Sequence, residues 1–172
     1  MIKHSNISVF VPHIGCPQRC SFCNQVHITG TSDCPNKESV DRAVAEAKAS
    51  KNYNPKNTEL AFFGGSFTAI NREYMLELLT AGYKYVKSGD VCGIRISTRP
   101  DAVNSEMLDI LKQHGVTAIE LGAQSMDDEV LLHNRRGHTA EDVVKASALI
   151  KEAGFSLGLQ MMTGLYTDTD EK

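Results

Sequence analysis

Three cysteines lie within one short segment of the chain, at positions 16, 20 and 23. Thiolates at this spacing can all bind one metal centre from a single loop. Structural zinc sites normally have four protein ligands, and ferredoxin clusters are held by four cysteines. No other cysteine of this sequence repeats the spacing, so a four-iron cluster held by Cys16, Cys20 and Cys23 would keep one iron open to a small chelating molecule. A zinc loop with His13 or His27 as the fourth ligand is the alternative.

Small and polar residues follow several other apolar runs. Gly64, Gly65 and Ser66 come directly after the run 59–63. Two glycines let the backbone approach a ligand closely because no side chain intervenes, although an ordinary tight turn has the same composition. The corresponding segments farther along the chain are Ser97-Thr98-Arg99, Gln124-Ser125 and Thr163-Gly164.

Strand-like and helix-like patterns alternate along the chain. The expected strands are residues 7–11, 59–63, 92–97, 116–121 and 155–162. The expected helices are residues 38–49, 71–86, 104–114 and 139–154, with Asn71, Asn104 and Thr139 as N-terminal caps. Five strands separated by helices favour an α/β fold with a parallel sheet and right-handed crossovers.

The positions of the cysteines and of the small and polar segments distinguish two architectures with parallel strands. Each of the segments above follows a different strand, so all of them should meet at the C-terminal edge of the sheet. Barrel enzymes build their sites there from several strands, whereas an open doubly wound sheet binds its ligand at one switch point. The sequence therefore predicts a partial (β/α) TIM-type barrel with parallel strands.

Composition and charge narrow the class of protein further. The 172 residues fit one domain, and 41% hydrophobic with 23% charged residues predicts a packed core. The net charge is -3 and no basic stripe indicates nucleic-acid binding, although a near-neutral sum is compatible with a small RNA-contacting patch. The sequence has no apolar run long enough to span a membrane and no signal-peptide pattern, so we expect a cytoplasmic protein. In such a compartment, crowded cysteines favour a metal site over disulfides.

The cysteine segment resembles the signature of the radical S-adenosylmethionine superfamily, Cys-x3-Cys-x-aromatic-Cys, with Phe22 as the aromatic residue. The resemblance implies a [4Fe-4S] cluster and S-adenosylmethionine as cofactors. It implies reductive cleavage of S-adenosylmethionine to a 5′-deoxyadenosyl radical that abstracts hydrogen from a substrate. It also implies an electron donor of the flavodoxin or ferredoxin type. A Gly-Gly-Glu-type segment contacts the methionine amino group in this superfamily, and Ser66 replaces the acidic residue here.

Three further segments resemble the catalytic subunit of Elongator, which modifies the wobble uridine of transfer RNA: residues 97–101, 120–125 and 134–139. A weaker likeness is to oxygen-independent coproporphyrinogen III oxidase. By position, Gln124 and Arg136 match residues that contact the cofactor. An amide can bond ribose hydroxyls, and a guanidinium can bond a carboxylate in a forked geometry. Without the resemblance, Gln124 would be a strand-end cap and Arg136 a solvated loop charge. The expected cofactor contacts are Phe22, Gly64, Gly65, Ser66, Gln124 and Arg136.

The resemblance covers nearly the whole chain and assigns residues 1–172 to one radical S-adenosylmethionine core domain. The superfamily core has six strand–helix units, and only five strands are expected here. Asp168 and Glu171 have the form of a helix cap whose helix does not follow. We therefore expect a domain truncated after its fifth strand, prone to self-association and weakly active by itself. The substrate implied is unidentified, with transfer RNA a candidate. A non-catalytic iron–sulfur or zinc-binding module is the alternative function.

Some residues are expected to have no chemical role. Cys92 opens a strand and is interpreted as a small buried residue, and Cys34 as an ordinary loop cysteine. Met161 and Met162 lie on a strand and are interpreted as core residues. The acidic run 127–129 is interpreted as a solvated helix start.

Overall fold

The computed structural model describes residues 4–12, 20–23 and 34–169. Its strands are β1 (Ser5–Val11), β2 (Thr58–Gly64), β3 (Gly93–Thr98), β4 (Val116–Gln124) and β5 (Ser156–Met161). Its α-helices are α2 (Lys37–Lys48), α3 (Arg72–Ser88), α4 (Ser105–Gln113), α5 (Asp128–His133) and α6 (Ala140–Glu152). Three short 3₁₀ helices join them: η1 (Pro55–Asn57), η2 (Phe67–Ala69) and η3 (Pro100–Ala102).

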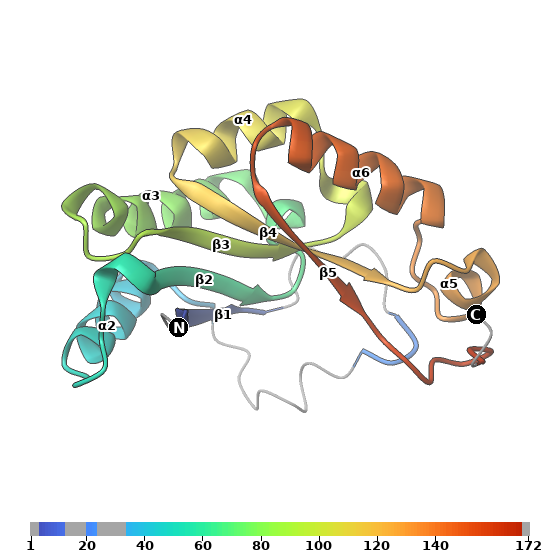
Figure 1. Cartoon of the computed structure of the whole chain (residues 1–172), viewed down its shortest axis with the longest axis horizontal. Helices are drawn as coiled ribbons and strands as arrows, with labels where there is room; N and C mark the ends of the chain where they lie inside the picture. Colours follow the sequence, from blue (N-terminus) through green and yellow to red (C-terminus); the bar gives the residue numbers. More distant parts are fainter. Residues whose placement is uncertain (1–3, 13–19, 24–33, 170–172) are drawn as a thin grey trace.

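The strands form one sheet in the order β1-β2-β3-β4-β5, and every neighbouring pair is parallel. Each strand therefore pairs with the next strand of the sequence, as in a (β/α) barrel, whereas a doubly wound sheet reverses its strand order. Figure 1 shows α3, α4 and α6 along one face of the curved sheet. The predicted α/β class and parallel sheet are confirmed, and the sheet forms part of a TIM-type barrel.

The hydrophobic core lies between the sheet and these helices. Alternate residues of each strand face it, because successive side chains of a strand point to opposite faces. Leu60 and Phe62 of β2 and Ile94 and Ile96 of β3 are fully buried there. The opposite face is the inner face of the partial barrel. It carries polar side chains such as Arg95, between Ile94 and Ile96.

The predicted helix starts are confirmed by side-chain hydrogen bonds to the first turn. Asn71 accepts from the Tyr74 amide at 3.1 Å, and Asn104 accepts from the Met107 amide at 2.8 Å. Thr139 and Asp142 form the predicted capping box of α6. The acidic run at 127–129 does start a helix, α5, with Asp127 as its cap.

Three details of the sequence interpretation are wrong. Strand β4 extends to Gln124 rather than ending at Leu121, because its pairing with β5 shifts register between these two residues and continues. Cys92 is exposed, since it lies just outside β3. Met161 and Met162 are 52% and 39% exposed because β5 is an edge strand of the sheet.

None of the described helices is long and apolar enough to cross a membrane.

Candidate functional site

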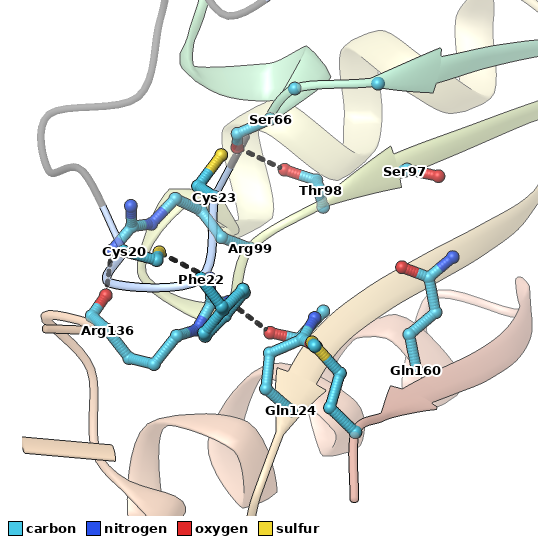
Figure 2. Close-up of a pocket in the computed structure, with 14 residues that line it drawn as sticks. Cys20, Phe22, Cys23, Ser66, Ser97, Thr98, Arg99, Gln124, Arg136 and Gln160 are labelled. Carbon is cyan, nitrogen blue, oxygen red and sulfur yellow. Dashed lines mark hydrogen bonds between the residues drawn. The ribbon is translucent and has the colours of Figure 1, made fainter. Parts of the chain in front are cut away.

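A cavity of about 200 Å³ opens at the C-terminal edge of the sheet. Its wall comes from the cysteine segment, from the ends of β2, β3, β4 and β5, and from the loop after α5 (Figure 2). The predicted site residues that line it are Cys20, Phe22, Cys23, Gly64, Gly65, Ser66, Gln124 and Arg136. The remaining predicted residue, Cys16, lies outside the described residues, as do His13 and His27 of the zinc alternative.

The cysteine segment enters the cavity through a tight turn. The Cys23 amide donates to the Cys20 carbonyl at 3.0 Å, and this turn brings both residues to the cavity wall. Cys20 is buried and Cys23 is half-buried. The described residues contain no group of three cysteine, histidine or acidic side chains close enough to hold a metal ion. A complete three-cysteine ligand set would include Cys16.

Arg136 connects the cysteine segment to the sheet. Its Nη2 donates to the Gly122 carbonyl of β4 at 2.6 Å, and its Nη1 donates to the Cys20 sulfur at 3.0 Å. The guanidinium carbon lies 5.9 Å from the centroid of the Phe22 ring, a cation–π distance. Nε is buried as well, and among the described residues it has no hydrogen-bond partner. Each Nη atom carries two N–H groups and uses one of them within the protein, so Arg136 keeps further donors for a ligand in the cavity that it lines.

Asn134 makes a second connection to the cysteine segment. Its backbone carbonyl accepts from the Ser21 amide at 3.2 Å, and its Oδ1 accepts from the Ser21 hydroxyl at 2.8 Å. Its Nδ2 donates to the carbonyls of Val130 in α5 and Tyr166 beyond β5, at 2.8 and 2.9 Å. One buried amide therefore joins three segments that are distant in sequence.

The glycine pair after β2 has two different local roles. A β-carbon on Gly64 would overlap the Val11 carbonyl oxygen and lie 2.6 Å from the Phe10 ring, and the φ angle of Gly64 is +123°. Gly64 is therefore required by the packing of β2 on β1. Gly65 donates its amide to the Val11 carbonyl at 3.0 Å and lines the cavity. Ser66 follows, with its hydroxyl 3.0 Å from that of Thr98.

Several residues that line the cavity had no assigned role in the sequence interpretation. Ser97, Thr98 and Arg99 end β3, and Gln160 lies on β5. Arg99 is buried, pairs with Asp101 and donates through Nη2 to the Arg136 carbonyl at 2.6 Å. The sequence did contain a signal for Ser97, Thr98 and Arg99, because they lie in a segment that resembles the catalytic subunit of Elongator. For Gln160 the only signal is a polar residue within an otherwise apolar run.

A charged layer lies below the cavity on the inner face of the sheet. Arg95 of β3 donates to Glu59 of β2 at 2.8 Å and also to Glu120 of β4. Thr117 donates to the second oxygen of Glu59 at 2.8 Å. Burial lowers the pKa of Arg95, but its hydrogen bonds and charge interactions with the two carboxylates outweigh burial and raise the pKa overall. The layer therefore joins three neighbouring strands through the guanidinium of Arg95.

His138 is a buried titratable group near the cavity. One ring nitrogen lies 3.2 Å from the Ala123 carbonyl, and the other, Nδ1, is buried and has no hydrogen-bond partner within the described parts of the chain. Burial lowers the pKa of His138, and the charge of Arg136 lowers it further. Because the neutral ring has one N–H, we assign that N–H to the nitrogen that faces the carbonyl.

The fold and site define a parallel β/α protein whose polar, cysteine-containing cavity lies at the C-terminal edge of its sheet. Residues 10–172 match the model of the Radical SAM superfamily, and the chain belongs to that family. The family uses a [4Fe-4S] cluster and S-adenosylmethionine and includes enzymes among the relatives of this chain.

The similar proteins agree with the resemblance found in the sequence. A tRNA uridine(34) acetyltransferase from Dehalococcoides mccartyi is 26% identical over 196 residues, which cover 96% of this chain and 43% of that protein. Proteins named Elongator complex protein 3 also match. The chain spans less than half the length of these relatives.

Solved structures share the fold. The Elp3 structure from Methanocaldococcus infernus has a TM-score of 0.68 at 22% identity, and covers 94% of this chain and 39% of that one. The coproporphyrinogen III oxidase HemN from Escherichia coli has a TM-score of 0.62 at 19% identity, and covers 96% and 38% respectively.

Proposed function

We propose that this chain is the core of an enzyme that reductively cleaves S-adenosylmethionine and uses the resulting radical on a substrate. One observation carries the proposal: eight of the nine predicted site residues line a single cavity, and the ninth lies outside the described residues. A module that only stores a metal has no need of a cavity beside its cysteines.

The described residues fit the implied cofactors chemically. Cys20 and Cys23 offer soft thiolate ligands, which suit iron–sulfur clusters. Arg136 lines the cavity, and within the described residues its guanidinium has N–H groups without an acceptor. Buried donors in that state are costly unless a ligand satisfies them, and a carboxylate group would do so.

Each residue then has a role in binding. Cys16, Cys20 and Cys23 would hold the cluster. Gly65 and Ser66 line the cavity, and because the Gly65 amide is bonded to Val11, the Ser66 hydroxyl or a backbone carbonyl would bond the methionine part of the ligand. Gln124 offers an amide for ribose hydroxyls. When bound, the cluster supplies the electron that converts S-adenosylmethionine into methionine and a 5′-deoxyadenosyl radical.

Anaerobic reconstitution with iron and sulfide tests the proposal. We expect four irons per chain, and 5′-deoxyadenosine after S-adenosylmethionine and dithionite are added. Cys16→Ala, Cys20→Ala and Cys23→Ala should each lose most of the iron, while Cys92→Ala, at an exposed position away from the cavity, should retain it. A colourless protein with one bound zinc would instead support the metal-binding module and contradict the proposal.

For the substrate we propose transfer RNA, because the similar proteins include a tRNA uridine(34) acetyltransferase. A reductant of the flavodoxin or ferredoxin type would supply the electron in the cell. Incubation of the reconstituted protein with transfer RNA, followed by mass analysis of its nucleosides, should reveal a changed uridine. If transfer RNA does not stimulate 5′-deoxyadenosine formation and none of its nucleosides changes, transfer RNA is excluded as the substrate. The proposed cleavage of S-adenosylmethionine would still stand.

A further inference from the structure

Arg136 carries a buried positive charge that has no carboxylate partner among the residues that the structure describes. Its side chain is largely buried, and in the described part of the chain it takes part in none of the ion pairs. Arg99 is buried to a similar extent but pairs with Asp101. A desolvated guanidinium without an anion is unfavourable, so the surroundings of Arg136 call for negative charge.

The atom that faces this charge is the sulfur of Cys20. Nη1 of Arg136 donates to it at 3.0 Å, while Nη2 is fixed on the Gly122 carbonyl at 2.6 Å. The planar guanidinium presents its donors in a rigid fork, so it cannot turn away from the sulfur without losing the bond to the strand. The ring of Phe22 lies against the same group.

We propose that Arg136 tunes the reduction potential of the cluster through its N–H bond to the Cys20 sulfur. This inference rests on the proposed function. One-electron reduction adds negative charge to the cluster and its thiolate ligands. A charged donor on a ligating sulfur stabilises that added charge, and hydrogen bonds to the sulfurs are among the factors that set cluster potentials. Arg136 therefore makes the cluster easier to reduce.

Asn134 keeps the bond in place. The two bonds from Ser21 to Asn134 fix the residue that directly follows Cys20. Asn134 is itself held through two backbone carbonyls, so it is a rigid anchor. Retention of the cluster and tuning of its potential are thus separable: Ser21 affects how firmly the loop is held, and Arg136 affects the charge felt by the sulfur.

A redox titration of the reconstituted chain with dithionite, followed by electron paramagnetic resonance of the reduced cluster, tests the inference. Arg136→Met removes the charge and the donor. We expect unchanged iron content and a ratio of reduced to oxidised cluster about tenfold smaller at a given potential, a shift of about 59 mV to more negative values for one electron. Arg135→Gln is the matched control, because it removes the same charge from the exposed neighbouring residue. Its potential should equal that of the parent.

Two further variants keep the test decisive. Arg136→Lys retains the charge with a single donor and should give an intermediate potential even if Arg136→Met folds poorly. Ser21→Ala should release iron faster to a chelator, with the potential of the parent. Equal potentials in the parent and both Arg136 variants, or an equal shift in Arg135→Gln, would overturn the inference. A parent chain that forms no cluster would overturn the proposed function instead.

Discussion

Replacement of Gly64 by alanine tests whether this glycine is required by the fold or by a ligand. The φ angle of +123° belongs to a region that side-chain-bearing residues rarely adopt, and the new methyl group would overlap the Val11 carbonyl. Backbone strain of this kind is worth ~1–3 kcal/mol, and overpacking adds ~1–3 kcal/mol. We therefore expect a loss of ~2–6 kcal/mol, a large part of the ~5–15 kcal/mol that keeps a domain folded.

Gly89 offers a matched control, because it separates the two contributions. Its φ is +76°, it ends α3, and a β-carbon there would meet nothing within 4 Å. Gly89→Ala should cost only the left-handed penalty of ~1–2 kcal/mol. Urea unfolding of the chain without cofactors, followed by circular dichroism, gives the loss of unfolding free energy for both variants. The slope of unfolding free energy against urea concentration should equal that of the parent. If Gly64→Ala were no more destabilising than Gly89→Ala, the packing of β2 on β1 would not explain this glycine.

Three other predictions follow from the same contacts. Gly65→Val should weaken S-adenosylmethionine binding more than iron binding, measured by titration of the reconstituted chain; equal affinity would remove this loop from the site. Asn134→Ala removes three side-chain hydrogen bonds, one buried and two part-buried, and should cost ~2–4 kcal/mol in urea unfolding at about 1 kcal/mol each, whereas Ser21→Ala, which removes one, should cost ~1 kcal/mol. Burial, with smaller effects of Cys34 and Glu77, raises the pKa of Tyr74 to about 12 in the folded chain. Because the pKa of an unfolded tyrosine is ~10, the neutral phenol of Tyr74 should contribute its full stabilisation of the fold below pH ~10. That contribution should disappear as the pH rises through about 12. Burial also raises the pKa values of Tyr53 and Tyr85, so the check is whether Tyr74→Phe removes the phenolate absorbance that appears at the highest pH in the parent.

The helices were predictable because their signals are local. Asn71, Asn104 and Thr139 cap the first turns with side chains only three residues away from the amides they accept. The strand order was predictable because polar segments follow several different strands, which favours a barrel, and the strands of a barrel pair in chain order. The true end of β4 was not predictable, since the register shift before Gln124 depends on β5, more than 30 residues away in sequence.

In the candidate site, too, some features were predictable from the sequence and others depend on contacts that form only in the folded chain. The residues at strand ends could be assigned to one edge of the sheet from their order along the chain, and they do line one cavity. The reason for Gly64 could not be assigned, because Phe10 and Val11 come near it only after β1 and β2 pair. The exposure of Met161 could not be assigned either, because composition does not distinguish an edge strand from a central one.

The anchors around the cavity were hidden for a more general reason. Arg99 donates to the backbone carbonyl of Arg136, Arg136 to that of Gly122, and Asn134 to two further carbonyls. Every residue has a carbonyl, so these partners have no signature in the sequence. The donors have a signature only in retrospect, as long polar side chains at alternate positions 134, 136 and 138, all buried while their neighbours are exposed. Because the acceptors belong to the backbone, substitutions at Val130 or Tyr166 that preserve the chain path should leave the anchors intact, whereas loss of a donor leaves a carbonyl unsatisfied. The geometry of the cysteine segment therefore depends on a few donor residues rather than on the many that surround it.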